Sequence, residues 1–202
     1  MVVWIVSPGS VEPWFSCENY LLPLTSDPGY EGEPTFSPDG ETIAYVSDRT
    51  GNFEIYIQQI SGGSYRNITE NPADDVQPAY SPDGKQIAFV SSRSSATKLR
   101  YDGYDLPLMG GDIWVIPALG GNARKVAEGG NFPSWSRDGS ALLFTAGPAF
   151  QQKIYRVDAQ GGEPREIVPR LDTGAGVPRF LLHPRYSADE RWIAHDSDHA
   201  CA

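Results

Sequence analysis

Four copies of one sequence run along this chain, and the first reads Pro34-Thr-Phe-Ser-Pro-Asp-Gly-Glu-Thr-Ile-Ala-Tyr-Val-Ser-Asp-Arg49. The other copies begin at Pro78, Pro133 and Pro184. Intervals of 44, 55 and 51 residues separate the aspartates that the copies share, which are Asp39, Asp83, Asp138 and Asp189. A period of this size predicts a repeat architecture such as a propeller.

Each copy has the pattern of a β-hairpin. Its first proline lacks an N–H group, so we expect it at the start of a short strand that also holds an aromatic residue. Ser-Pro-Asp-Gly then predicts a turn, because proline sets the first dihedral angle, aspartate bonds to its own backbone and glycine adopts a positive φ. The second strands are rich in β-branched and aromatic residues and are expected at residues 43–46, 87–90, 142–145 and 193–196.

Two further strands complete each repeat. Third strands are predicted at residues 53–57, 112–116 and 153–157, and each of them precedes a Gly-Gly pair that indicates a hairpin. Fourth strands are predicted at residues 65–69, 123–127 and 164–168. Four antiparallel strands per repeat predict an all-β fold, a β-propeller of four-stranded blades.

The sequence resembles the WD40-like, or PD40, repeats of TolB-type β-propellers. Ser-Pro-Asp-Gly, Ile-Ala-Tyr/Phe-Val-Ser, Ser-Asp-Arg-Thr-Gly-Asn at residues 47–52 and the Gly-Gly pairs carry the resemblance. Similar repeats build the periplasmic TolB propeller, the propellers of prolyl-oligopeptidase-like enzymes and oligogalacturonate lyases, so the resemblance implies a fold more firmly than a function. Two copies depart from the pattern, with Arg137 in place of a turn proline and with Ala188 and Glu190 in place of Pro and Gly. Glu190 disfavours the usual geometry of the fourth turn.

We expect one domain, residues 1–202, with repeats at about 34–77, 78–132, 133–183 and 184–202. Residues 2–6 and 20–25 match third and fourth strands, so residues 1–33 are expected to complete the last repeat. Ring closure would then pair residues 2–6 antiparallel with residues 192–196 and remove the exposed strand edges. The alternative is an open arc of a larger six- or seven-bladed propeller.

The composition and net charge of the chain limit the classes of partner that it is expected to bind. The net charge of −10 and the sequence pI near 4.7 argue against sequence-independent nucleic-acid binding and against docking on anionic lipid. Membrane insertion is not expected, because the longest apolar run near the N-terminus, residues 2–6, is far below the ~20 residues of a membrane-spanning helix. The family resemblance suggests the periplasm or cell envelope, although we find no signal peptide in this sequence. Cys17 and Cys201 are expected to be free thiols.

Two insertions predict the functional face. One lengthens the second repeat at residues 94–110, and the other precedes the fourth copy at residues 170–183. In an up-and-down blade both connections emerge on the same face, where we expect a protein or peptide partner. The candidate binding residues are Arg49, Asn52, Arg93, Tyr101, Asp102, Tyr104, Asp105, Asp112, Arg170, Asp172 and His183. For Arg49, Asn52 and Arg93 the alternative is a structural role in turns.

Motifs for catalysis are scarce. The chain has no Gly-x-Ser-x-Gly elbow, Walker loop or dinucleotide fingerprint, so we predict no catalytic residues and no cofactor. All three histidines, His183, His195 and His199, fall in the fourth copy, and ligands from several blades would normally converge on a metal, so no metal site is predicted. The leading prediction is a non-catalytic binding or scaffold module. The alternatives are a metal-dependent enzyme resembling oligogalacturonate lyase and a propeller fragment of a larger exported protein or peptidase.

Overall fold

The computed structural model describes residues 4–7, 20–25, 27–94, 111–147, 152–167 and 180–198. Their regular structure consists of antiparallel strands, as the sequence predicts. No helix within these ranges is long and apolar enough to cross a membrane.

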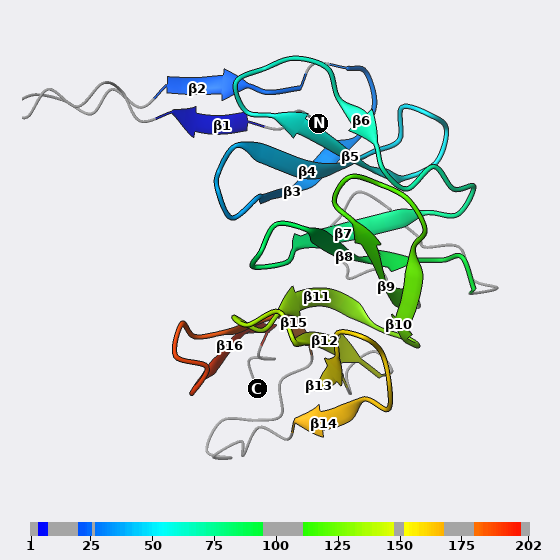
Figure 1. Cartoon of the computed structure of the whole chain (residues 1–202), viewed down its shortest axis with the longest axis vertical. Helices are drawn as coiled ribbons and strands as arrows, with labels where there is room; N and C mark the ends of the chain where they lie inside the picture. Colours follow the sequence, from blue (N-terminus) through cyan, green and yellow to red (C-terminus); the bar gives the residue numbers. More distant parts are fainter. Residues whose placement is uncertain are drawn as a thin grey trace, which may run out of the picture.

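Three complete blades form the middle of the chain (Figure 1). The first blade consists of β3 (Glu31–Phe36), β4 (Thr42–Ser47), β5 (Glu54–Gln59) and β6 (Arg66–Asn67). The second consists of β7 (Asp75–Tyr80), β8 (Gln86–Ser91), β9 (Asp112–Pro117) and β10 (Arg124–Ala127). The third consists of β11 (Asn131–Trp135), β12 (Ala141–Ala146), β13 (Lys153–Asp158) and β14 (Arg165–Ile167). Each blade runs from its first to its fourth strand in chain order, as predicted.

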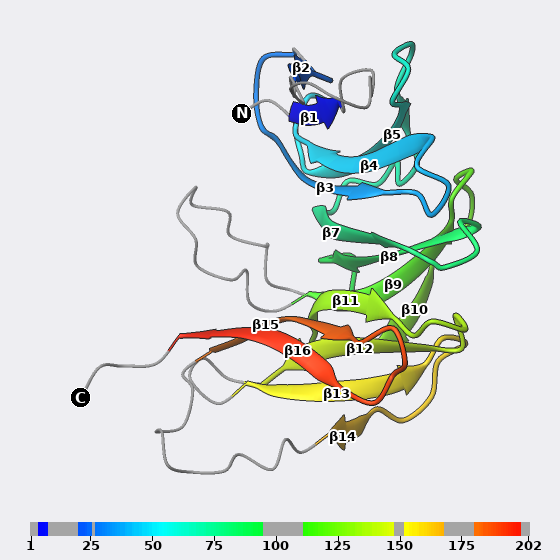
Figure 2. The same ribbon diagram turned by 90° about the vertical axis from the view of Figure 1, so that its left-hand side faces the viewer.

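Two further two-stranded sheets flank the three blades, one beyond the first blade and one packed against the third (Figures 1 and 2). β1 (Trp4–Ser7) pairs with β2 (Tyr20–Pro23), which agrees with the third and fourth strands predicted there. β15 (Phe180–Tyr186) pairs with β16 (Ile193–Asp198) and corresponds to the first two strands of a fourth blade. The first strands β3, β7, β11 and β15 lie side by side along the inner edge of the arc.

The predicted pairing of residues 2–6 with residues 192–196 is wrong for this structure. β1 and β16 belong to separate sheets, and Figure 2 shows β1 beyond the first blade and β16 beside the third. Four blades close a ring only if each turns by about 90° relative to the last, whereas the six- and seven-bladed alternative needs only ~50–60° per blade. Among the described residues neither β1 nor β2 contacts β15 or β16, so the arc is open, as in the alternative of a larger propeller.

The hydrophobic core lies between the blades and depends on the second strands. Residues 43–46, 87–90 and 141–144 are almost completely buried, because both faces of these strands are covered by neighbouring blades. This double coverage explains why these strands read as continuous apolar runs rather than as alternating ones.

The turn between the first and second strands has the same geometry in all four copies, although only the first two copies read Ser-Pro-Asp-Gly. In the first, Gly40 N–H donates to Ser37 O at 2.9 Å, and Asp39 Oδ1 accepts from Ser37 Oγ and from Glu41 N–H. The fourth turn keeps this geometry despite its departures, since Glu190 adopts a φ of 55° and its N–H donates to Ser187 O at 2.9 Å. The departure expected at Glu190 is therefore absent.

The departures of the third and fourth turns compensate each other. Glu190 Oε1 accepts a hydrogen bond of 2.5 Å from the main-chain N–H of Arg137, a donor that the usual proline would lack. The Arg137 side chain donates through Nη1 to Ala188 O at 2.9 Å. Arg137 thus has a backbone N–H group where the usual proline has none. Glu190, which replaces the usual glycine in the next blade, accepts the hydrogen bond from that group.

Candidate binding site on the propeller axis

The repeat prolines do not begin their strands, contrary to the sequence-based expectation. Each inner strand starts two or more residues earlier and loses its register at the proline, for example between Gly32 and Thr35 in β3. The residue before each proline has a positive φ: 51° at Glu33, 56° at Gln77, 54° at Phe132 and 48° at His183. Such bulges redirect side chains, and a positive φ outside glycine carries a conformational cost that the surrounding structure must offset.

These bulges line a single cavity of about 170 Å³ on the inner edge of the arc. Each of four blades contributes the residue before its proline, the proline and the residue after it. The walls therefore combine four proline rings with the side chains of Glu33, Gln77, Phe132 and His183. We call this cavity the axial pocket.

Hydrogen bonds between blades hold the pocket side chains in place. Glu33 Oε2 accepts from Gln77 N–H at 2.6 Å, and Gln77 Oε1 accepts from Phe132 N–H at 2.6 Å. Phe132 cannot continue this series, and its ring instead lies 4.3 Å from the ring of His183, centroid to centroid. His183 Nδ1 lies 2.9 Å from Asp196 Oδ2. Burial raises the pKa of Glu33, and the hydrogen bond from Gln77 offsets only part of that rise.

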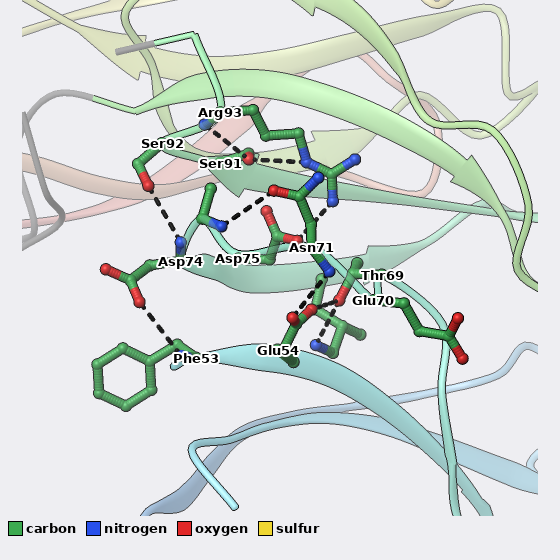
Figure 3. A network of polar contacts seen from close by, with 12 residues as sticks. Phe53, Glu54, Thr69, Glu70, Asn71, Asp74, Asp75, Ser91, Ser92 and Arg93 are labelled. Carbon is green, nitrogen blue, oxygen red and sulfur yellow. Dashed lines mark hydrogen bonds and ion pairs between the residues drawn. The ribbon is translucent and has the colours of Figure 1, made fainter. Parts of the chain in front are cut away.

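A second arrangement recurs where the inner strands begin. Arg93 Nη2 pairs with Asp75 Oδ2 at 2.5 Å, and Arg93 Nε donates to Ser91 Oγ at 3.1 Å (Figure 3). In the first blade Arg49, Glu31 and Ser47 make the same contacts at 2.5 and 3.1 Å. Each arginine also lies over aromatic rings of its own blade, Arg49 within 3.8 Å of the Tyr65 ring centroid. We call each set of arginine, carboxylate and serine a brace.

Comparison with known proteins agrees with this architecture. Residues 21–105 match the family model described as TolB beta propeller domain. A stretch of 40 residues is 45% identical to the Tol-Pal system protein TolB of Bordetella pertussis, which covers 20% of this chain and 9% of that protein. TolB from Acinetobacter baumannii superimposes with a TM-score of 0.66 and 24% identity, over 89% of this chain and 40% of that one. The chain is a TolB-like β-propeller repeat protein.

Another solved structure, a putative TolB from Agrobacterium tumefaciens, matches the TolB-like chain with a TM-score of 0.64 and 24% identity. That match covers 91% of this chain and 64% of that one. The TolB-like chain therefore spans less than two thirds of the length of these relatives, and at this identity the solved structures show the fold alone.

The strand ends of the TolB-like blades define two faces. β7 begins, β8 ends and β9 begins at the same end of the second blade, because Asp75 pairs with Ser91 and Ser91 pairs with Asp112. We call this end the loop face and the end with the Ser-Pro-Asp-Gly turns the turn face. The strand ends that flank both insertions, residues 94 and 111 and residues 167 and 180, lie at the loop face. The sequence predicts this placement.

The predicted site residues that the structure describes fall into two groups. His183 lines the axial pocket, whereas Arg49 and Arg93 are held in the braces with side chains only 9% and 14% exposed. Asn52 Nδ2 donates to Asn71 O and Ala73 O at 2.9 Å, and Asp112 Oδ1 accepts from Gly129 N–H at 2.9 Å. These four polar residues hold loops of the loop face together, and the arginines brace their own blades rather than a neighbour.

Several predicted residues lie outside the described ranges: Tyr101, Asp102, Tyr104, Asp105, Arg170 and Asp172, together with Cys17 and Cys201. Sequence reasoning overlooked Glu33, Gln77 and Phe132. The available signal was their shared position directly before a repeat proline, where the residue type changes from copy to copy while the proline does not. Within the described ranges no group of three or more His, Cys, Asp or Glu residues is placed to hold a metal ion.

The Asp75 brace predicts a pH dependence of stability. Asp75 is completely buried and its Oδ1 has no hydrogen-bond partner, so desolvation raises its pKa to about 6 despite the pairing with Arg93. Since the unfolded pKa is near 3.9, the folded chain binds more protons between about pH 4 and 6, and its stability falls as pH rises through that window. We expect Asp75→Asn to remove a fall of roughly 2–3 kcal/mol from the pH profile, measured by urea unfolding.

The turn aspartates do not confound this measurement. Hydrogen bonds lower the pKa values of Asp39, Asp83 and Asp189, and lower that of Asp138 to about 2. The stability that they contribute is lost only as pH falls below about 4. Identical slopes for wild type and Asp75→Asn between pH 4 and 6 would contradict the assignment.

Proposed function

We propose that this TolB-like chain is a binding module that docks a protein or peptide partner on its loop face, over the axial pocket. The convergence of one side chain from each of four blades on a single cavity carries the proposal. Glu33 lies two residues from the start of β3, so the cavity is near the loop face. Both insertions attach to strand ends at that same face, and loops carried on a rigid scaffold often hold binding residues.

The unusual backbone conformation of the pocket residues supports a role in binding. A positive φ at four equivalent non-glycine residues is costly, yet all four blades keep it and direct these side chains toward one cavity. Strained residues of this kind cluster at ligand sites, where the surrounding structure holds them ready for contact. The net charge of −10 favours a partner with basic groups, whose association would slow as salt rises.

Substitution of Tyr101 and Tyr104 by alanine tests the loop face. Aromatic anchors supply much of the energy of protein interfaces, so each substitution should weaken binding by about 1 kcal/mol or more, roughly fivefold. Peptides selected from a phage-displayed library on the immobilised chain provide the ligand, and isothermal titration calorimetry measures its affinity. Thermal unfolding should show nearly unchanged stability.

The matched control is Leu119→Ala, since Leu119 is 83% exposed in the β9–β10 turn on the turn face. It should leave peptide affinity unchanged. If Leu119→Ala abolishes binding while the tyrosine variants bind normally, the partner uses the turn face. Stoichiometric divalent metal in the purified chain, with turnover of uronides that His183→Ala removes, would instead favour the lyase.

A further inference from the structure

Three acidic residues lie near the starts of the first two inner strands, and two of them are paired with an arginine. Glu31 and Asp75 are 1% and 0% exposed, and each is paired with an arginine of its own blade. Glu33 lies in the same strand as Glu31 but has no cationic partner within 4.0 Å among the described residues. Glu33 is only partly exposed, and a carboxylate that loses part of its hydration without gaining a counter-charge is costly, which makes Glu33 the exception that needs an explanation.

The Glu33 carboxylate is fixed in position. Its Oε2 accepts from Gln77 N–H at 2.6 Å, while the bulge at Pro34 and the φ of 51° direct the residue toward the axial pocket. The same hydrogen bond links the first blade to the second, so the carboxylate cannot turn away without breaking a contact between blades. One oxygen is thus held by the fold, and the group as a whole lines an open cavity.

The rest of the pocket suits the end of a basic side chain. The face of an aromatic ring attracts a cation, and the Phe132 ring lines the same cavity as Glu33. The rings of Pro34, Pro78, Pro133 and Pro184 offer apolar surface for a methylene chain. A cavity of about 170 Å³ has room for such a group.

We propose that the axial pocket takes the cationic end of a lysine or arginine side chain from the partner, with Glu33 as its counter-charge. This inference rests on the proposed binding function and names the chemistry that the pocket selects. Glu33 thereby does for the partner what Glu31 and Asp75 do for Arg49 and Arg93. The rise in the pKa of Glu33 with burial is the cost that such a cation would offset.

Two basic residues of the chain share the pocket without filling this role. His183 Nδ1 is paired with Asp196, and Arg185 lines the pocket without an ion pair to Glu33. Arg185 carries the same charge as the proposed ligand and should repel it. Arg185→Ala is therefore expected to strengthen binding of a cationic ligand.

The test is an NMR titration of the ¹⁵N-labelled 202-residue chain with N-acetyl-lysine amide. Its neutral counterpart, N-acetyl-norleucine amide, has nearly the same alkyl chain without the charge. We expect millimolar binding of the lysine compound, reported by the amide signals of Gln77 and Phe132, and at least about tenfold weaker binding of the norleucine compound. Glu33→Gln should weaken lysine binding by a similar factor, because glutamine keeps the acceptor for Gln77 N–H but loses the charge.

The matched control is Glu163→Gln, which removes the same charge from an exposed residue outside the pocket and should leave binding unchanged. An unchanged amide spectrum outside the pocket checks that Glu33→Gln remains folded. Equal binding of the two compounds, or equal binding by wild type and Glu33→Gln, would overturn the inference. Peptides that still bind through Tyr101 and Tyr104 in that case would leave the proposed function standing.

Discussion

Replacement of Arg93 by alanine is expected to lower the free energy of unfolding by about 3–5 kcal/mol, because it leaves the carboxylate of Asp75 buried without a counter-charge. Asp75 is 0% exposed, and Arg93 Nη2 contacts its Oδ2 at 2.5 Å. The Arg93 side chain also covers the rings of Phe89 and Trp114, so the substitution removes packing as well as charge. Urea unfolding at pH 8 measures the loss from the shift in midpoint.

Two further variants separate charge from packing. Asp75→Asn in the Arg93→Ala background should recover part of the loss, because a neutral amide is cheaper to bury than an unpaired carboxylate. The loss in Arg93→Ala should also be smaller at pH 5 than at pH 8, since the unpaired carboxyl binds a proton more readily. Arg191→Ala, at an exposed residue of the fourth turn, is the control and should change stability by less than about 0.5 kcal/mol. A loss below 1 kcal/mol for Arg93→Ala would contradict the brace.

Substitution of Gly130 by alanine is expected to destabilise the fold by about 1–3 kcal/mol through overpacking. A Cβ atom at this residue would lie 2.5 Å from Phe144 Cδ2 and 2.9 Å from two side-chain atoms of Ile113. Both neighbours are buried in the core between the second and third blades, so neither can move aside freely. Thermal and urea unfolding measure the effect.

The control is Ser61→Ala, at an exposed residue between β5 and β6, which should change stability by less than about 0.5 kcal/mol. Phe144→Leu should partly rescue Gly130→Ala by making room, so the double variant should be more stable than the sum of the two single effects indicates. If the losses of stability in the two single variants simply add up in the double variant, contact with Phe144 is not the cause of the destabilisation in Gly130→Ala.

In the first three repeats, the arginine, carboxylate and serine of a brace are either all present or replaced together. Serine and arginine recur together in the first two repeats, at Ser47 and Arg49 and at Ser91 and Arg93, each with a buried carboxylate at the start of the inner strand. In the third repeat Gly130 occupies the place of that carboxylate, and Ala146 occupies the place of the serine. A carboxylate alone at Gly130 would be buried and unpaired, which explains why the members are replaced together.

Much of the fold follows from local chemistry in the sequence. Turn residues such as proline, aspartate and glycine, Gly-Gly pairs and apolar runs of strand length are sufficient to predict four strands per repeat, and the structure confirms three complete blades and two half blades. These features depend on residues close in the chain, so a repeat in the sequence becomes a repeat in space. Even the attachment of both insertions to strand ends at the loop face follows from strand order alone.

The tertiary structure decided the rest. The angle between blades depends on how side chains of different repeats pack together, and the predicted ring closure failed because no local pattern reports that angle. The axial pocket escaped notice for the same reason, since the repeat prolines were expected to begin strands but lie at bulges instead. Only the arrangement of four blades brings Glu33, Gln77, Phe132 and His183 to one cavity, although 150 residues separate the first from the last. The sequence by itself thus determines the blades, whereas contacts between distant repeats determine the curvature of the arc and the site on its axis.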